Sequence, residues 1–199
     1  MRHKNTPTTS PAKKRDHLFE MASGQFGLFT AKQAIRAGYN RKHFHTFVES
    51  GEWSHELLGL FRLVNYPSAP EQEYMKWLLW SRNRADKIQG CLSYETALYV
   101  YKLGDLMPNQ IHMTVPRDFR RNGEAPIILQ LHQENLRAES IQLENGLLLT
   151  TPTKTLEDLI RDGRTDKTTL EDSLTKAVEM GIITRKQMSE SEALQSLSN

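Results

Sequence analysis

The chain has 199 residues, a length that fits one domain or two small ones. Apolar residues make up 38% and charged residues 25%, so the chain can bury a core and is not disordered throughout. No apolar run approaches the roughly 18 residues that cross a bilayer, and residues 1–10 lead into no apolar signal-peptide segment. The single cysteine, Cys91, excludes an internal disulfide. These features predict a cytoplasmic protein.

The net charge of +2 hides an uneven distribution along the chain. Residues 1–66 hold ten Lys and Arg against five Asp and Glu, together with five of the seven histidines. From residue 67 onward the balance is 16 against 19. Such an asymmetry favours a polyanion as the partner of the first part. Ordinary scatter of charges on a solvated surface is the alternative, and the order of the elements has to decide between them.

Residues 1–10 are predicted to be a flexible basic tail. The first domain, residues 11–66, is predicted as three helices followed by a hairpin, at 11–23, 31–35, 41–50, 53–58 and 60–66. Glycines close the helices, and Thr30-Ala-Lys-Gln33 forms a capping box at the start of the second helix. Asn40 is the expected N-cap of the third.

Two short helices joined by a glycine-containing turn are typical of a helix-turn-helix, and a hairpin behind them is typical of a wing. Phe44, Phe47 and Val48 share the inner side of the third helix, which leaves a polar outer side. In such a domain the start of this helix meets base edges while nearby cations neutralise phosphates. The expected DNA contacts are Asn40, Arg41, Lys42, His45 and Thr46 at the bases, and Lys13, Lys14, Arg15 and Arg62 at the phosphates. A core unit with a merely polar outer face is the alternative.

Pro67-Ser-Ala-Pro70 predicts a linker at 67–72, followed by a second domain at 73–199. Strands are expected at 111–115, 127–131, 141–143 and 147–150, and helices at 71–84, 93–101 and from Pro152 onward. Asn145-Gly146 predicts a tight hairpin turn, and capping boxes at 168–171 and 189–192 predict two further helices. The expected fold class is α+β, with helices packed on a small, mostly antiparallel sheet in the second domain.

No constellation in the sequence predicts catalysis, a metal or a cofactor. His43 and His45 are two residues apart in a helix, so they point to different faces. Cys91 fits a buried inert thiol. The adjacent carboxylates at 157–158 and 171–172 diverge on their helices and fit solvated surface. Glycine-rich phosphate loops and nucleophile motifs are absent, so we do not expect an enzyme.

A basic cluster in the second domain permits two interpretations. Arg117, Arg120 and Arg121 follow a predicted strand and precede Asn122-Gly123, which places them on a loop. They fit an exposed loop, or contacts with DNA phosphates or a charged partner.

Seven short motifs follow one another along the chain in an order and spacing that together are more specific than any one of them. They are Gly27-Leu-Phe-Thr-Ala-Lys-Gln-Ala-Ile-Arg-Ala-Gly38, Phe47-Val-Glu-Ser-Gly51, Leu58-Gly-Leu-Phe-Arg-Leu63, Leu92-Ser-Tyr-Glu-Thr-Ala-Leu98, Leu103-Gly-Asp-Leu-Met-Pro108, Ile111-His-Met-Thr-Val-Pro116 and Leu149-Thr-Thr-Pro-Thr-Lys-Thr-Leu-Glu-Asp-Leu159. With these motifs, residues 13–165 resemble the AbiEi group of abortive-infection (AbiE) antitoxins, the transcriptional regulators of type IV toxin-antitoxin systems in viral defence. Lys154 stands where the family favours arginine, and Thr96 where serine is common.

The resemblance implies a repressor that binds inverted repeats of double-stranded operator DNA upstream of its own operon through the N-terminal domain. It implies that the C-terminal domain counters a nucleotidyltransferase-like toxin without needing a stable complex. Carried over by position, it adds Lys32 and Gln33 to the expected DNA contacts. A stand-alone transcriptional regulator remains open, as does an interaction protein that binds a toxin or RNA and uses the winged helix for protein contacts. A solitary nuclease or transferase is disfavoured by the missing motifs.

Overall fold

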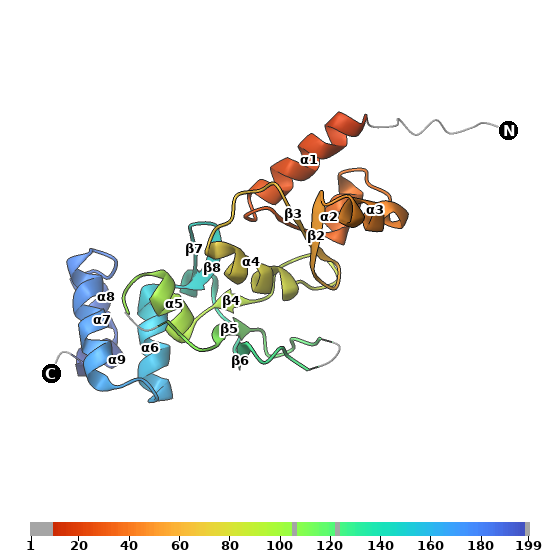
Figure 1. The fold of residues 1–199 in the computed structure, drawn as a ribbon. Coiled ribbons are helices and arrows are strands. Elements are labelled where there is room, and N and C mark those ends of the chain that lie inside the picture. The colour runs from red at the N-terminus through yellow and green to blue at the C-terminus, as the bar shows by residue number, and fades with distance from the viewer. Residues whose placement is uncertain (1–9, 105–106, 122–123, 198–199) are drawn as a thin grey trace. The chain divides into compact units, whose positions relative to one another are not determined.

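A computed structural model describes residues 10–104, 107–121 and 124–197, so most of the predicted tail at 1–10 lies outside the described residues. The chain divides into two compact units, of which the first ends at Ile88 and the second begins at Gln89. Both contain helices and strands (Figure 1), which confirms the predicted α+β class. No described helix is long and apolar enough to cross a membrane.

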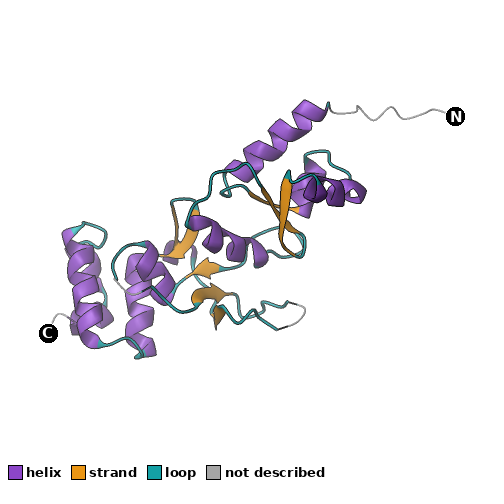
Figure 2. Ribbon diagram, viewed as in Figure 1, coloured by secondary structure: helices purple, strands orange, loops and turns teal. Residues whose placement is uncertain are grey.

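The first unit carries four α-helices, a 3₁₀-helix and a small antiparallel sheet of strand order β1-β3-β2 (Figure 2). Its elements are α1 (Pro11–Ser23), β1 (Leu28–Thr30), α2 (Ala31–Arg36), η1 (Arg41–His43), α3 (Phe44–Glu49), β2 (Trp53–Leu57), β3 (Leu60–Leu63) and α4 (Glu71–Trp80). The predicted helices and hairpin are confirmed. Strand β1 was not predicted, because its three residues are too few to show the alternation of a strand.

The caps that the sequence predicts are present at α2 and η1. Thr30 and Gln33 form the reciprocal capping box of α2. Asn40 Oδ1 accepts a hydrogen bond from the Lys42 backbone N–H at 3.0 Å, so the next helical segment begins where expected. Its first turn is the 3₁₀-helix η1, and the α-helical part starts only at Phe44. The predicted third helix is therefore two short segments.

Aromatic side chains form the core of the first unit, with Trp53 in the middle. Its ring centroid lies 4.8 Å from that of Phe29, 5.2 Å from Phe44 and 4.6 Å from Phe47. Phe29 and Trp53 are buried, at 0% and 3% exposure. Each such ring removes roughly 150–250 Å² from water, and edge-to-face pairs add about 0.5–1.5 kcal/mol beyond that. The cluster joins β1, η1–α3 and β2.

Helix α4 belongs to the first unit, whereas the sequence assigned it to the second domain. It packs against β1 and β3, and Gln72 Nε2 donates to the Phe26 carbonyl at 2.8 Å. Pro67 and Pro70 therefore lie inside this unit, and the division falls 16 residues after the end of the predicted linker at 67–72. With this division the charge asymmetry is larger: 14 Lys and Arg against 8 Asp and Glu in residues 1–88, and 12 against 16 in residues 89–199.

The second unit has a sheet of strand order β6-β5-β4-β8-β7 and a helical C-terminal part. Its elements are β4 (Cys91–Leu92), α5 (Tyr94–Val100), β5 (Ile111–Val115), β6 (Leu129–Gln133), η2 (Ala138–Ser140), β7 (Ile141–Glu144), β8 (Leu147–Thr150), α6 (Pro152–Asp162), α7 (Lys167–Glu179), α8 (Arg185–Glu190) and α9 (Glu192–Leu197). The hairpin turn at Asn145-Gly146 is confirmed, with positive φ at both residues.

The prediction of a mostly antiparallel sheet is wrong, because this sheet is mixed. β5 pairs with β6, and β4 with β8, in parallel, while β4–β5 and β7–β8 are antiparallel. The sequence signals strands but not their directions, and only the β7–β8 turn fixed a direction in advance. β6 also begins two residues later than predicted, and Ile127 is 93% exposed.

Two predicted capping boxes are replaced by neighbouring caps. Asp166, rather than Thr168, caps α7, with Oδ1 accepting from the Thr169 N–H at 2.9 Å. Thr184 and Gln187 form a capping box at α8 that was not predicted. α9 follows Ser191, whose hydroxyl accepts from the Leu194 N–H at 3.4 Å, and does not start at Ser189. Several Ser, Thr and Asp residues near each helix start could serve as the N-cap. Which of them does so depends on how the helix packs.

Replacing Gly27 by alanine should destabilise the first unit by about 2–4 kcal/mol. Gly27 has φ +83°, and an added Cβ would lie 2.6 Å from Tyr66 Cβ. Gly51→Ala is the matched control: it has φ +75° with nothing within 4 Å of the added atom, so only backbone strain of about 1–2 kcal/mol is expected. Urea unfolding followed by tryptophan fluorescence measures both, and equal losses would contradict the contact with Tyr66.

Candidate nucleic-acid interface

The first half of α1 and the turn before α3 enclose a hollow of about 480 Å³. Gly38, at φ +98°, turns the chain beneath α1, where a Cβ would lie 3.3 Å from the Lys14 side chain. This close approach brings predicted DNA contacts from distant parts of the sequence to one surface. The hollow is lined by Pro11, Ala12, Lys14, Arg15, Tyr39, Asn40, His43, Phe47 and Glu52.

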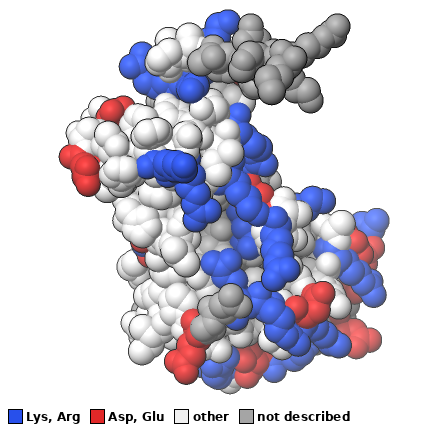
Figure 3. All heavy atoms as spheres, turned by 90° about the vertical axis from the view of Figure 1, so that its right-hand side faces the viewer, with Lys and Arg blue, Asp and Glu red and all other residues white. Residues whose placement is uncertain are grey.

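The lysines and arginines of α1 and η1, of which Lys14 and Arg15 line the hollow, lack protein partners among the described residues. Within residues 10–104, 107–121 and 124–197, no ion pair or side-chain hydrogen bond involves the cationic groups of Lys13, Lys14, Arg15, Arg41 and Lys42. All are exposed except Lys14, which is half-buried. Lys and Arg side chains are prominent on the face shown in Figure 3. Unpaired cations keep their charge available for phosphate.

Several other cations of the first unit already have protein partners. Lys32 Nζ donates to the Arg84 carbonyl at 2.5 Å, and Arg62 Nε lies 3.3 Å from Glu56 Oε1. Lys32 and Arg62, both expected at DNA, thus have local partners. Their side chains are held by the protein and are less available to phosphate than those around the hollow.

Gln33 lies in the interior, at 7% exposure. Its Oε1 accepts from the Thr30 N–H at 2.7 Å, and its Nε2 donates to Gln25 Oε1 at 2.9 Å. Both ends of the amide are therefore used for capping and packing. Gln33, which the family resemblance suggested as a DNA contact, instead caps the start of α2. It is therefore not part of the candidate interface.

His45 and Thr46 are exposed on α3, one turn after Arg41 and Lys42, while Phe44 faces the core at 6% exposure. His45 Nε2 and Thr46 Oγ1 lie 3.5 Å apart. The predicted polar outer side of this helical segment is therefore present, and it begins at the unpaired cations of η1. The candidate interface consists of Lys13, Lys14, Arg15, Asn40, Arg41, Lys42, His45 and Thr46.

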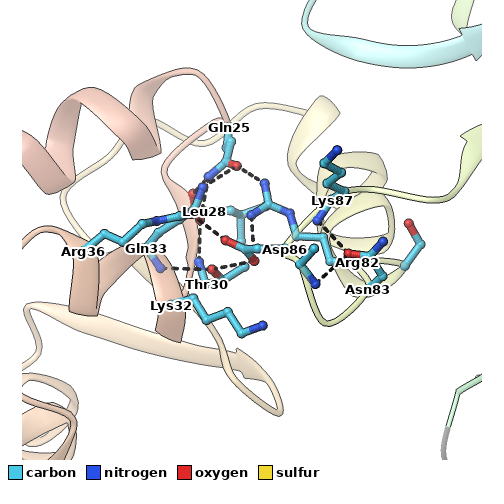
Figure 4. A network of polar contacts seen from close by, with 12 residues as sticks. Gln25, Leu28, Thr30, Lys32, Gln33, Arg36, Arg82, Asn83, Asp86 and Lys87 are labelled. Carbon is cyan, nitrogen blue, oxygen red and sulfur yellow. Dashed lines mark hydrogen bonds and ion pairs between the residues drawn. The ribbon is translucent and has the colours of Figure 1, made fainter.

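A network of ion pairs and hydrogen bonds fixes α2 to the segment that follows α4 (Figure 4). The Asp86 carboxylate, 7% exposed, meets Arg36 at 2.5 Å and Arg82 at 3.2 Å. It also accepts from the Thr30 hydroxyl at 3.4 Å, and Arg82 donates to Gln25 Oε1 at 2.5 Å. Burial lowers the pKa of Arg82, and Asp86 opposes this. Asp86 thus ties both ends of α2 to the C-terminal part of the unit.

Asp86→Asn should lower the free energy of unfolding of the first unit by about 2–4 kcal/mol, because Arg82 would keep a largely buried charge without its counter-ion. Glu71→Gln is the control, since this α4 carboxylate is not joined to the network. Urea unfolding followed by tryptophan fluorescence reads both variants. A loss below about 0.5 kcal/mol for Asp86→Asn would show that the network is a weak surface pairing.

The second unit holds a polar cluster that was not predicted from the sequence. His112 on β5 and His132 on β6 face each other, with Nδ1 and Nε2 3.1 Å apart, and Glu95 Oε2 lies 3.0 Å from the same Nδ1. The Tyr94 ring stacks on His132 at 3.7 Å, and Tyr94 has φ +50°. The signal was available in the alternation of Ile111-His-Met-Thr-Val115, which puts His112 and Thr114 on one face.

Burial lowers the pKa of His132 to about 4, and the neighbouring His112 lowers it further. Burial also lowers the pKa of His112, against the opposing effect of Glu95. Both rings are therefore neutral at pH 7. Because the folded-state pKa of His132 lies below the ordinary 6.5, its neutral form stabilises the fold above that pH, and this stability is lost as the pH falls towards 4.

His132→Phe keeps a ring against Tyr94 and removes the titrating group. The variant should lose about 2 kcal/mol less stability than the wild type between pH 6.5 and 4. Gln133→Ala, which alters an exposed residue of the same strand that does not titrate, is the control and should leave the slope unchanged. Urea unfolding followed by circular dichroism gives the pH dependence, and parallel slopes for all three proteins would contradict the lowered pKa.

Asp158 contradicts the expectation that the 157–158 pair is solvated surface. It is 1% exposed, and Lys154 Nζ bridges Asp158 Oδ1 at 2.7 Å and Glu134 at 2.9 Å. Burial raises the Asp158 pKa, and Lys154 opposes this. Cys91, the expected inert thiol, is 3% exposed, and burial raises its pKa to about 12.

Arg117, Arg120 and Arg121 are exposed in the segment after β5. Arg120 donates to the carbonyls of Arg117 and Phe119, at 3.3 and 2.8 Å. Among the described residues, no group of three His, Cys, Asp or Glu side chains is placed to hold a metal ion.

Comparisons with known proteins add little to this geometry. No family model matches the chain, and no curated protein is detectably similar. Among solved structures, the chain is similar to the RV2827C protein from Mycobacterium tuberculosis, with a TM-score of 0.48 and 14% identity over 96% of this chain and 82% of that chain. A likeness at this level does not bear on function.

Proposed function

We propose that the first unit is a winged helix-turn-helix that binds double-stranded operator DNA, and that the protein is an AbiE-like antitoxin that represses its own operon. The observation that carries this proposal is that Lys14 and Arg15 of α1 line the same hollow as Asn40 and His43. Arg41 and Lys42 lie between those two residues in the chain, and among the described residues none of these four cations has a protein partner. Four other cations of the unit do have partners: Lys32, Arg36, Arg62 and Arg82. An exposed cluster of uncompensated positive charge is maintained against mutual repulsion, which fits a polyanionic partner.

In this proposal η1 and α3 enter the major groove. Arg41 and Lys42 lie at the start of this segment, where a recognition helix meets base edges, and His45 and Thr46 follow on the outward side. Lys13, Lys14 and Arg15 of α1 contact phosphates. The β2–β3 hairpin is the wing, whose tip residue Leu58 is 95% exposed.

The second unit is proposed to counter a nucleotidyltransferase-like toxin. Its 12 Lys and Arg against 16 Asp and Glu give it the opposite charge balance to the first unit, which supports a different partner. The ordered motifs shared with AbiEi-type antitoxins support the same assignment. Two hydroxyls of this unit donate to carboxylates at 2.6 Å, Ser191 to Glu157 and Thr169 to Asp166. Both pairs stand at helix starts, where Ser191 and Asp166 serve as caps, so we propose a non-enzymatic role.

Arg41→Ala combined with Lys42→Ala should weaken binding to the DNA upstream of the protein's own gene by about 10–100-fold while the fold is kept. Because these side chains are placed at base edges, the slope of log affinity against log salt should change by less than the roughly 1.8 expected for two lost phosphate contacts. Fluorescence anisotropy with a labelled duplex at several salt concentrations measures both quantities.

The matched control is Lys167→Ala combined with Lys186→Ala, which removes two exposed lysines of the second unit that pair with glutamates on their own helices. This variant should bind DNA like the wild type. Unchanged binding by a folded Arg41/Lys42 variant would refute the placement. Capture of the neighbouring gene product by a protein that ignores upstream DNA would instead favour the interaction protein.

A further inference from the structure

The hollow beside α1 has an aromatic wall as well as cations. Tyr39 and Phe47 line it, with their ring centroids 5.1 Å apart, and both pack on Trp53 behind them. Both side chains are half-buried, so part of each ring remains open to the hollow. A flat phosphate-binding surface has no need of such a wall, whereas a planar base or ring can stack on it.

A second hollow of about 370 Å³ shares Arg15, Tyr39 and Glu52 with the first. The two hollows adjoin at these shared residues beside α1, and we call the pair the α1 groove. Each hollow falls within the roughly 300–1,000 Å³ of small-molecule sites. The volume of either hollow is therefore in the range that a ligand of nucleotide size occupies.

The polar groups of the α1 groove select the charge of an occupant. The basic lining residues are Lys14, Arg15 and His43, and the acidic lining residue is Glu52. Burial raises the pKa of Tyr39, and the Glu52 carboxylate adds to this effect, so its hydroxyl stays protonated as a donor. Glu52, which also accepts from the Ser50 hydroxyl at 3.2 Å, has acceptor capacity left for an amino group. The groove therefore offers cations for an anion, a ring surface and an acceptor.

We propose that the α1 groove binds a free nucleoside monophosphate, with its phosphate at Lys14 and Arg15 and its base against Tyr39 and Phe47. Lys14, Arg15 and Asn40 also belong to the candidate DNA interface, so bound nucleotide and DNA phosphates compete for them. The competition rests on the proposed function, because it requires that the first unit binds DNA. Nucleotide binding is supported by the residues of the groove alone. The nucleotide thus acts as an effector that releases the DNA.

Isothermal titration calorimetry of the full chain with AMP, adenosine and inorganic phosphate tests the site. AMP should bind at least about tenfold more tightly than either half, because only AMP uses both the cations and the ring surface. No heat with AMP up to millimolar concentrations, or phosphate binding as tightly as AMP, would overturn the proposal.

Two α1 variants locate the site. Arg15→Gln should weaken AMP binding by about tenfold, whereas His17→Gln, which alters an exposed α1 residue outside the groove, should leave it unchanged. Equal effects of the two variants would refute the location. Tyr39→Phe keeps the ring and should retain most of the affinity, while Tyr39→Leu should lose it; circular dichroism checks that both variants are folded.

Competition is read by fluorescence anisotropy with the upstream duplex, to which AMP is added. Release of DNA by AMP, but not by equal concentrations of adenosine, supports the effector role. If AMP binds in calorimetry and the duplex binds but is not released, the effector role fails. If the duplex does not bind at all, the proposed function fails while the nucleotide site is still judged by calorimetry alone.

Discussion

The packing of Trp53 is the contact on which the first unit depends. Its indole is surrounded by Phe29, Phe44 and Phe47, so one ring sets the distance between the sheet and the η1–α3 segment. The Tyr39 ring packs edge-to-face against the same indole and is part of the aromatic wall of the α1 groove. The candidate interface and the groove are thus two outer surfaces of one aromatic cluster. Conditions that loosen this cluster would affect both together.

Ion pairs show which cations of the first unit stabilise the fold and which can still bind a ligand. The number of cations alone does not show this. Arg36 and Arg82 share the Asp86 carboxylate, and Arg62 has Glu56. The lysines and arginines of α1 and η1 have no acidic partner among the described residues. The first unit is positive by composition, but only part of that charge can attract a ligand. Net charge in a sequence cannot make this distinction, because the acids that neutralise a base lie elsewhere in the chain, as Asp86 does for Arg36.

The sequence predicted the local features of the fold well. Thr30–Gln33, Asn40, Asn145-Gly146 and Pro152 act within a few residues, and each lies where expected. The parallel pairing of β5 with β6, the place of α4 and the burial of Asp158 depend on distant contacts, and these predictions were wrong or missing. For the candidate site, exposure of Arg41 and Lys42 followed from helical period. The interior position of Gln33 did not, because a capping glutamine and a base-reading glutamine have the same sequence pattern.

Asp86 lies two residues before the end of the first unit, yet its carboxylate pairs with Arg36 on α2, fifty residues earlier in the chain. The last residues of the unit therefore hold one of its first helices. A fragment that ended at the predicted linker would lack α4, Arg82 and Asp86, and Arg36 would lose its ion pair. The smallest piece of the chain that keeps the first unit intact thus extends to about Ile88.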